Sequence, residues 1–249
     1  MDKSQLLGST TAKNGFKNEK NIATKFNSWK TDEDARKWLS IMQYDLNEIE
    51  KVEAIILPNK YKSDIQVKVS IILKDAISAE NISIKLVSNL RGFNQIDKRW
   101  VDDYTQMWNI PKKIETLLKQ FTGEITHNDL NRKEQRRAYL DEFSIEQQTN
   151  IINFFEENKL MIVTDLLKGR DRLSADWFMV AQKVEKNQKW TLNPISYVLN
   201  FFGNGPVFIT NRGSLRIGKI TMQRKGGDNG RKTAQMLQFK INPAELFKI

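Results

Sequence analysis

The stretch "SDIQVKVSIILKDAISAENISIK", residues 63–85, decides the fold that this sequence predicts. It contains two runs rich in Ile and Val with interleaved polar residues, a pattern typical of two β-strands joined by a turn. A similar run, "VEAIILP", precedes them at residues 52–58. Three strand-like runs in succession predict a central sheet in this part of the chain.

A helix is predicted on the N-terminal side of these strands. Residues 1–14 are expected to form a polar arm. The following stretch, "NGFKNEKNIATKFNSW", places Phe16, Ile22 and Phe26 near one face of a helix. Glu19 lies three residues from both Phe16 and Ile22, so we expect its carboxylate on or beside that apolar face.

Further elements alternate along the chain without a clear linker. The stretch "TDEDARKWLSIMQYDL" predicts a second helix with Thr31 and Asp34 as a capping-box-like pair. Helices are also expected at roughly 97–121, 129–141, 144–157 (capped by Ser144) and 193–202, and a strand at 174–184. The C-terminal third predicts two strands around the Gly-rich, basic turn "RKGGDNGRK", residues 224–232. The order indicates a mixed α/β fold and a single domain over residues 1–249.

The composition favours a polyanionic partner. The chain has 249 residues, a net charge of +10 and 39% hydrophobic residues, enough to build a packed core. A strongly basic balance is typical of proteins that bind nucleic acid. The alternative, an ordinary basic protein, is not excluded by charge alone.

Several classes of site and segment are excluded or unexpected. The chain has no cysteine, so disulfides, thiolate metal sites and Cys nucleophiles are excluded. Its single histidine, His127, cannot build a His-based metal site, and its polar surroundings favour a surface position. No apolar run is long enough to cross a membrane, and the N-terminus lacks the apolar core of a signal peptide. We therefore expect a cytoplasmic protein with no membrane partner.

Asp64 and Lys85 could carry phosphodiester hydrolysis. Asp64 opens the first strand of the 63–85 stretch and Lys85 closes the second, while Ser83 shares a strand face with Lys85. Such chemistry needs a divalent metal that polarises oxygen, for which Asp64 would be the main ligand. Lys85 would position the attacking water and offset charge on the phosphate. The alternative is a solvated sheet face that happens to carry an Asp and a Lys.

Longer stretches of the chain resemble a known nuclease family. The segments "GFKNEKNIATKF", "KSD", "KLVSNLRGFNQIDKRW" and "RKGGDNGRKTAQMLQFKI", in this order, are similar to those of GCGC-cleaving type II restriction endonucleases of the Hin P-one-I type. That family belongs to the PD-(D/E)XK nuclease superfamily. The resemblance covers nearly the whole chain, and it implies a restriction-endonuclease-like fold, a central mixed β-sheet flanked by helices. It also implies Mg²⁺-dependent cleavage of double-stranded DNA at a short palindrome, GCGC.

The resemblance also assigns roles at the active site. Ser63 and Asp64 match the family's Ser-Asp pair, and Lys85 matches the Lys that ends its motif. Ser83 is a departure, because the resemblance implies a Gln at this position in the family, which itself departs from the acid that is usual in the superfamily. Asp64, Ser83 and the carbonyl of Ile84 would hold one metal, and Glu19 is the candidate carboxylate for a second. For Glu19 the alternative is a surface acid of the helix, paired with Lys17 or Lys20.

Two basic loops and the N-terminal arm are the candidate DNA-reading segments. Arg and Lys read guanine, and Gln and Asn add further donors and acceptors. Phe93 could wedge between base steps, or it could anchor its loop in the core. The glycines would allow a tight turn close to DNA. The candidates are Lys13, Asn14, Lys17, Ser63, Arg91, Phe93, Asn94, Gln95, Lys98, Gln223, Arg224, Lys225, Gly226, Gly227, Asn229 and Arg231.

Other functional hypotheses remain open at this point. A DNA-binding protein that has lost cleavage through Ser83 is the main alternative, and a structure-specific repair nuclease on the same fold is another. A restriction enzyme implies a cognate DNA methyltransferase that protects the host. A palindromic target suggests a homodimer, or a monomer that cuts the two strands in sequence.

Overall fold

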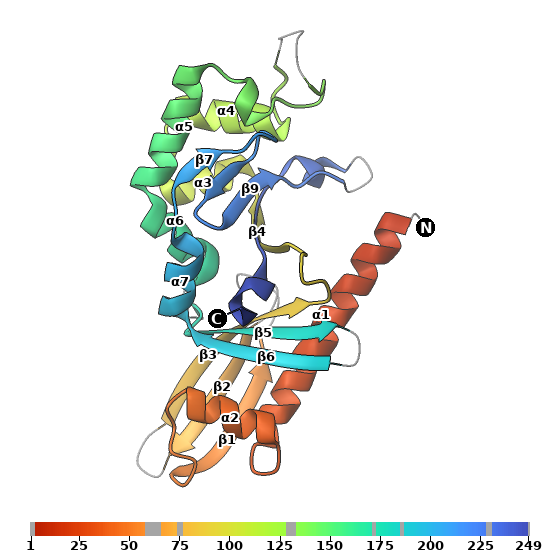
Figure 1. The fold of residues 1–249 in the computed structure, drawn as a ribbon, viewed down its shortest axis with the longest axis vertical. Coiled ribbons are helices and arrows are strands. Elements are labelled where there is room, and N and C mark those ends of the chain that lie inside the picture. The colour runs from red at the N-terminus through yellow and green to blue at the C-terminus, as the bar shows by residue number, and fades with distance from the viewer. Residues whose placement is uncertain are drawn as a thin grey trace. The chain divides into compact units, whose positions relative to one another are not determined.

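The structure is a computed structural model that describes residues 3–57, 66–73, 77–127, 133–170, 173–184, 187–227 and 231–248. The chain forms two compact units, each assembled from segments that are distant in the sequence (Figure 1). The first unit comprises Met1–Asn94, Leu167–Val198 and Asn242–Ile249, and the second comprises Gln95–Leu166 and Leu199–Ile241. That these units act as one domain stays a prediction.

A five-stranded mixed sheet forms the centre of the first unit. Its strands are β1 (Ile49–Ile56), β2 (Gln66–Leu73), β3 (Ile77–Val87), β5 (Trp177–Val184) and β6 (Asn187–Pro194), in the order β1-β2-β3-β5-β6. β3 and β5 run parallel, and the other neighbours run antiparallel. The antiparallel pairing of β2 with β3 confirms the two strands expected in the 63–85 stretch.

Two helices, α1 (Lys3–Asn27) and α2 (Glu33–Ile41), supply one side of the core in the first unit (Figure 1). Ile22 and Phe26 of α1 and Trp38 of α2 belong to one buried cluster with Ile82 and Ile84 of β3. The rings of Phe26 and Trp38 lie 5.1 Å apart. A short 3-10 helix, η4 (Pro243–Phe247), contacts β3 and β5.

The N-terminal region differs from the prediction at three points. The polar arm expected at 1–14 is wrong, because α1 already begins at Lys3; once a helix is nucleated, each added residue gains a hydrogen bond. Phe16 is exposed, since six residues of helix rotate it away from Ile22. The cap of α2 is Asp32 rather than Thr31, and its carboxylate accepts a hydrogen bond from Ala35 N at 3.0 Å.

The second unit contains a second five-stranded sheet and most of the remaining helices. Its strands, in sheet order, are β4 (Asn94–Arg99), β10 (Leu237–Ile241), β9 (Ile220–Arg224), β8 (Leu215–Ile217) and β7 (Val207–Ile209). The helices are α3 (Val101–Trp108), α4 (Lys112–Thr122), η1 (Leu140–Glu142), α5 (Ile145–Glu157), α6 (Lys159–Leu167) and η3 (Lys232–Gln235). A further helix, α7 (Ile195–Gly203), begins in the first unit and ends in the second, and Leu167 at the end of α6 belongs to the first. The antiparallel pairing of β9 with β10 confirms the two strands predicted around the basic turn.

The sequence predicted some helices of this unit and mistook others. Ser144 caps α5 through a capping box, as predicted. The helix expected at 97–121 is instead the end of β4 followed by α3 and α4, which are interrupted before Pro111 because proline disfavours a helical residue ahead of it. The helix expected at 129–141 is wrong in its described part, which holds only the 3-10 turn η1. β4, α6, β6, β7 and β8 were not predicted.

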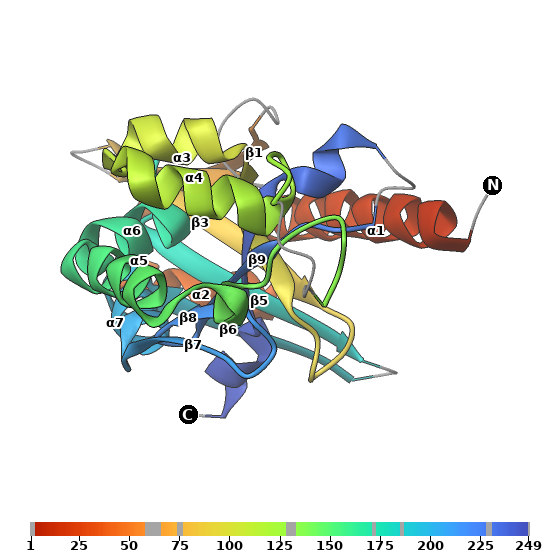
Figure 2. The same ribbon diagram turned by 90° about the horizontal axis from the view of Figure 1, so that it is seen from above.

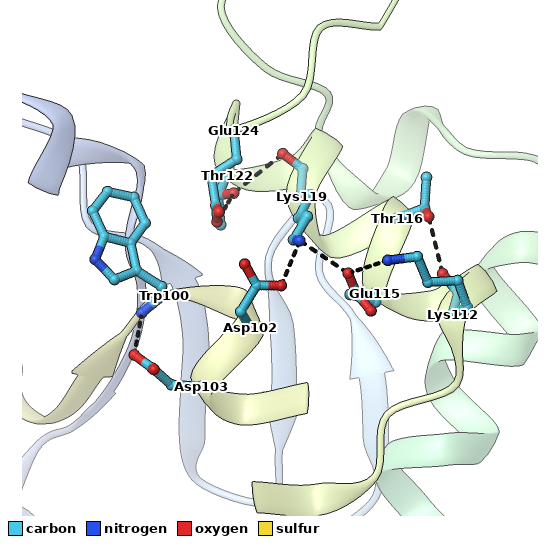
Figure 3. A network of polar contacts seen from close by, with 9 residues as sticks. All are labelled: Trp100, Asp102, Asp103, Lys112, Glu115, Thr116, Lys119, Thr122 and Glu124. Atoms are coloured by element: carbon cyan, nitrogen blue, oxygen red, sulfur yellow. Dashed lines mark hydrogen bonds and ion pairs between the residues drawn. The ribbon is translucent and has the colours of Figure 1, made fainter. Parts of the chain in front are cut away.

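A polar network ties α3 to α4, which lie side by side (Figures 2 and 3). Lys119 Nζ contacts the carboxylate of Asp102 at 2.5 Å and that of Glu115 at 2.9 Å. Lys112 adds a second ammonium at 2.8 Å from Glu115. The hydrogen bonds from Lys112 and Lys119 hold the pKa of Glu115 below its usual range, so this buried acid stays ionised.

Candidate functional site

The central strand β3 buries two polar side chains. Ser83 is 4% exposed and Lys85 is 5% exposed. Ser83 pairs with Gln66 of β2 and with Phe178 of β5, and Lys85 pairs with Val180. Because alternate residues of a strand point to opposite faces, the two polar groups share the face opposite to the core residues of β3. This placement contradicts the solvated-face alternative, since both side chains are buried.

Asp64 and Ser63, the predicted partners of Lys85, lie outside the described residues. Gln66 follows Asp64 by two residues and begins β2. The ladder places Gln66 opposite Ser83.

A second pair of buried polar side chains lies on α1. Glu19 is 1% exposed, and the neighbouring Asn18 is also buried. Glu19 shares a helical stripe with Ile22 and Phe26, so it faces the sheet-side core rather than solvent. The alternative of a surface acid paired with Lys17 or Lys20 is therefore wrong.

Asn18 is a candidate site residue that the sequence interpretation missed. Its Oδ1 atom is buried and has no hydrogen-bond partner among the described residues. An unpartnered buried amide costs free energy, so its place beside Glu19 points to a ligand or a water. Its position four residues before Ile22 was the available signal, because that spacing places Asn18 on the buried stripe.

The donor atoms in this unit suit an oxygen-binding metal. No cluster of three or more His, Asp or Glu side chains that could hold a metal occurs among the described residues, which leave out Asp64. Glu19 offers a carboxylate, Ser83 a hydroxyl and Asn18 an amide oxygen. Mg²⁺ prefers oxygen ligands and needs few from the protein, so each of these oxygen donors is of a kind that suits this ion.

Positive charge accompanies α1 in the first unit. Lys13, Asn14 and Lys17 are exposed on α1. Burial lowers the pKa of Lys183 on β5, and the positive charges of Lys17 and Lys25 lower it further. The positive charges of these lysines therefore repel one another, and together they favour the binding of an anion nearby.

The loop between β3 and β4 forms a fixed turn. Gly92 N donates to Asn89 O at 2.9 Å, and Asn94 Nδ2 donates to Leu86 O at 2.9 Å. Phe93 is 49% exposed, so the alternative that it anchors the loop in the core is wrong. Arg91 and Lys98 are exposed, and Gln95 is partly buried.

The turn between β9 and β10 is held by a buried glutamine. Gln238 Nε2 donates to the carbonyls of Arg224 and Lys225, each at 3.2 Å. Gly226 and Gly227 have φ angles of 62° and 65°, which favour glycine, and a Cβ on either would meet open space. Sequence interpretation missed Gln238; its signal is a polar residue between Leu237 and Phe239 in the strand "LQFKI".

Other predicted residues of this turn are placed as follows. Gln223 pairs with Gln238 in the ladder, and Arg231 is exposed at the start of η3. Arg224 is largely buried, with a side chain 13% exposed. Asn229, with Asp228 and Gly230, lies outside the described residues.

The architecture of the chain is that of a restriction endonuclease. The fold matches that of the restriction endonuclease MspI in a crystal structure with its cognate DNA, with a TM-score of 0.64 at 16% sequence identity. The match covers 96% of this chain and 93% of that one. The predicted restriction-endonuclease fold is confirmed.

Residues 42–247 match the model of the R.HinP1I restriction endonuclease family. The chain belongs to this family, and it is therefore a type II site-specific deoxyribonuclease with DNA as its substrate. Restriction endonucleases of this kind generally use a divalent metal. A comparison with curated proteins gives no match. Within the described residues, none of the helices has the length and apolar character needed to cross a bilayer.

Proposed function

We propose that this enzyme uses Mg²⁺ to cleave both strands of DNA at the palindrome GCGC. The observation that carries the catalytic part is the buried Ser83–Lys85 pair on the central strand, opposite the start of β2 that follows Asp64. Family membership supports the target, together with the basic stretches at 88–100 and 223–241.

The proposed metal ligands are Asp64, Ser83, Glu19 and the backbone carbonyl of Ile84. When bound, the metal would polarise the phosphate oxygens and offset the charge that develops on them. Lys85 orients the attacking water with its ammonium group and stabilises the same charge. Burial strengthens this electrostatic effect, because the surroundings of Lys85 screen less than water.

The proposed DNA contacts divide into two kinds. Exposed Lys13, Asn14 and Lys17 on α1 would contact phosphates or a groove, and Phe93 would wedge between base steps. Base reading is assigned to the loops that follow β3 and β9, where side-chain donors can reach guanine. Not every proposed contact outside α1 reads a base: Ser63 precedes β2, and Gly226 and Gly227 can offer only their backbone. The full set, base-reading and backbone-contacting together, is Ser63, Arg91, Asn94, Gln95, Lys98, Gln223, Arg224, Lys225, Gly226, Gly227, Asn229 and Arg231.

The test is a digest of DNA of known sequence with Mg²⁺ or with EDTA, followed by sequencing of the ends. We expect discrete ends at GCGC that need Mg²⁺. Discrete ends at another sequence would still support a site-specific nuclease but would contradict GCGC as its target. The difference in target would then be assigned to the loops at 91–98 and 223–231. A folded protein that binds DNA without cutting it would contradict the proposal and make Ser83 the cause.

Two variants test the catalytic residues in the same digest. Asp64→Ala and Lys85→Met should each lower the cleavage rate by about 10²-fold or more, while much of the DNA binding remains. Lys51→Met is the matched control, because Lys51 is exposed on β1. This variant should cleave DNA like the wild type. Loss of folding in both active-site variants would instead indicate structural roles.

The proposed partners follow from the palindromic target. A homodimer would cut both strands in one encounter, whereas a monomer cutting in sequence would accumulate a nicked intermediate. Sedimentation of the protein with uncleaved DNA, combined with a time course on a supercoiled plasmid, distinguishes the two. A cognate DNA methyltransferase would block cleavage, so methylated GCGC sites should resist the enzyme.

A further inference from the structure

The segment at residues 133–139 of the second unit has an irregular but well-supported backbone. Ala138 N donates to Gln120 O at 2.9 Å, and Leu140 N donates to Gly213 O at 3.1 Å. Gly123, the left-handed cap of α4, lies directly against the carbonyl of Arg136, where a Cβ would collide. These contacts fix the segment on the end of α4, so its side chains have defined positions.

This segment brings Arg137 close to Arg224 of β9, with the carboxylate of Glu134 between them. Arg137 Nε contacts Glu134 Oε2 at 3.2 Å, and Arg224 Nη1 lies 3.8 Å from Glu134 Oε1. The guanidinium of Arg137 also lies over the ring of Tyr139, at 4.1 Å from its centroid. The carboxylate of Glu134 therefore interacts with two guanidinium groups. It also accepts a hydrogen bond from the hydroxyl of Tyr139, at 3.3 Å.

The positive charge of this cluster exceeds what Glu134 neutralises. Burial lowers the pKa of Arg224, and the positive charges of Arg137 and Arg136 lower it further, despite the opposing effect of Glu134. Arg224 Nε is buried and has no hydrogen-bond partner among the described residues. Arg137 and Arg224 share the carboxylate of Glu134, and the positive charge of Arg136 also acts on Arg224. This excess of positive charge favours the binding of an anion.

The cluster lies at the base of the β9–β10 turn. Arg224 is the last residue of β9, and Lys225, Gly226 and Gly227 follow it. Burial also lowers the pKa of Lys240 on β10, and the positive charge of Lys225 lowers it further. The cluster and these two lysines therefore surround the first residues of the turn with positive charge.

We propose that Arg136, Arg137 and Arg224 form a site for one phosphate of the DNA backbone, and that Glu134 holds Arg137 and Arg224 in place before DNA binds. The inference rests on the proposed contact between the β9–β10 turn and DNA. Arginine suits this role, because its planar group binds phosphate oxygens in pairs and stays charged at all relevant pH values. The site would fix the position of the turn on the duplex without reading sequence.

The test measures the affinity of the protein for short fluorescent DNA duplexes, with and without GCGC. Fluorescence anisotropy gives this affinity in EDTA over a series of salt concentrations. Arg136→Gln and Arg137→Gln should each weaken binding to both duplexes equally, by about three- to tenfold. Each should also reduce the slope of log affinity against log salt concentration by about one. Glu134→Gln should bind both duplexes more tightly, because it removes a competing negative charge but keeps an acceptor oxygen. Arg212→Gln, at an exposed site in the same unit, is the control and should bind like the wild type.

Lys225→Gln distinguishes this inference from the proposed function. If Lys225→Gln weakens binding while Arg136→Gln and Arg137→Gln do not, the phosphate site is overturned and the turn keeps its role. If all three bind like the wild type, both the phosphate site and the proposed contact between the β9–β10 turn and DNA are overturned. Arg137 packs over Tyr139 and could be needed for folding, so exposed Arg136 is the deciding position. Weaker binding by Glu134→Gln would also overturn the site.

Discussion

Ser83 and Lys85 are residues whose chemistry depends on burial as much as on identity. Ser83 lies in the middle of the sheet, between Gln66 and Phe178 in the ladder. A larger side chain there must find room among buried neighbours, at a cost of about 1–3 kcal/mol. The gain would be an amide oxygen that reaches further toward a metal than the Ser hydroxyl.

We expect Ser83→Gln to retain or increase the cleavage rate, measured over a range of Mg²⁺ concentrations, with a lower melting temperature. The reason is that Gln supplies the longer neutral ligand, while its volume strains the strand. Ser83→Ala is the control, since it removes the hydroxyl without adding volume. A sharp loss of rate in Ser83→Gln, with the fold intact, would contradict the proposed ligand role.

Asp32 combines a helix cap with an ion pair. Its carboxylate accepts from Ala35 N and lies 3.0 Å from Lys25 Nζ. Partial burial raises the pKa of Asp32, but the hydrogen bonds from Ala35 N and Lys25 outweigh this effect and leave the pKa below its usual range. A lowered pKa means that this stabilisation is complete above the ordinary carboxyl pKa and is lost as pH falls below it.

Asp32→Ala should therefore lower the free energy of unfolding by about 1 kcal/mol at neutral pH, and by less at about pH 3. Urea unfolding at the two pH values measures this difference. Asp32→Asn should lose less than Asp32→Ala at neutral pH, because Asn also caps helices. An equal penalty for Asp32→Ala at both pH values would show that charge does not contribute.

At the scale of elements, two glycine turns of the second unit differ in what they require. Gly123 has a φ of 83°, and a Cβ there would collide with the carbonyl of Arg136. Gly226 has a φ of 62°, but a Cβ there would meet nothing within 4 Å. The first glycine is needed for both conformation and space, and the second for conformation alone.

Gly123→Ala should therefore destabilise the protein more than Gly226→Ala, for which the left-handed conformation alone costs about 1 kcal/mol. Thermal unfolding of the two variants measures the comparison. Because Gly123 supports the 133–139 segment, its substitution should also weaken DNA binding in the anisotropy assay. Equal melting temperatures for the two variants would mean that the backbone near Arg136 relaxes without cost.

At the scale of the whole molecule, neither compact unit is a continuous piece of chain. The first unit contains three segments and the second contains two, so the chain passes from one unit to the other four times. Each unit can close its core only after distant segments have come together. This interleaving favours a single cooperative unfolding transition.

We expect one calorimetric transition, with a calorimetric enthalpy equal to the van't Hoff enthalpy, as the single-domain prediction requires. Intrinsic fluorescence of the six tryptophans and far-UV circular dichroism should report the same midpoint. Two separate transitions would show that the units unfold independently and would contradict the prediction.

The sequence by itself determined the strands around 63–85, the Ser144 cap, the basic turn at 224–232 and the family. These are local signals: alternating Ile and Val, a capping pair, and runs of glycine and cationic side chains. The tertiary structure decided the long-range pairings: the parallel ladder of β3 with β5, the burial of Asn18, Glu19 and Lys85, and the arginine cluster around Glu134. Those features need residues that lie far apart in the sequence, and periodicity in a single segment carries no information about its distant partner.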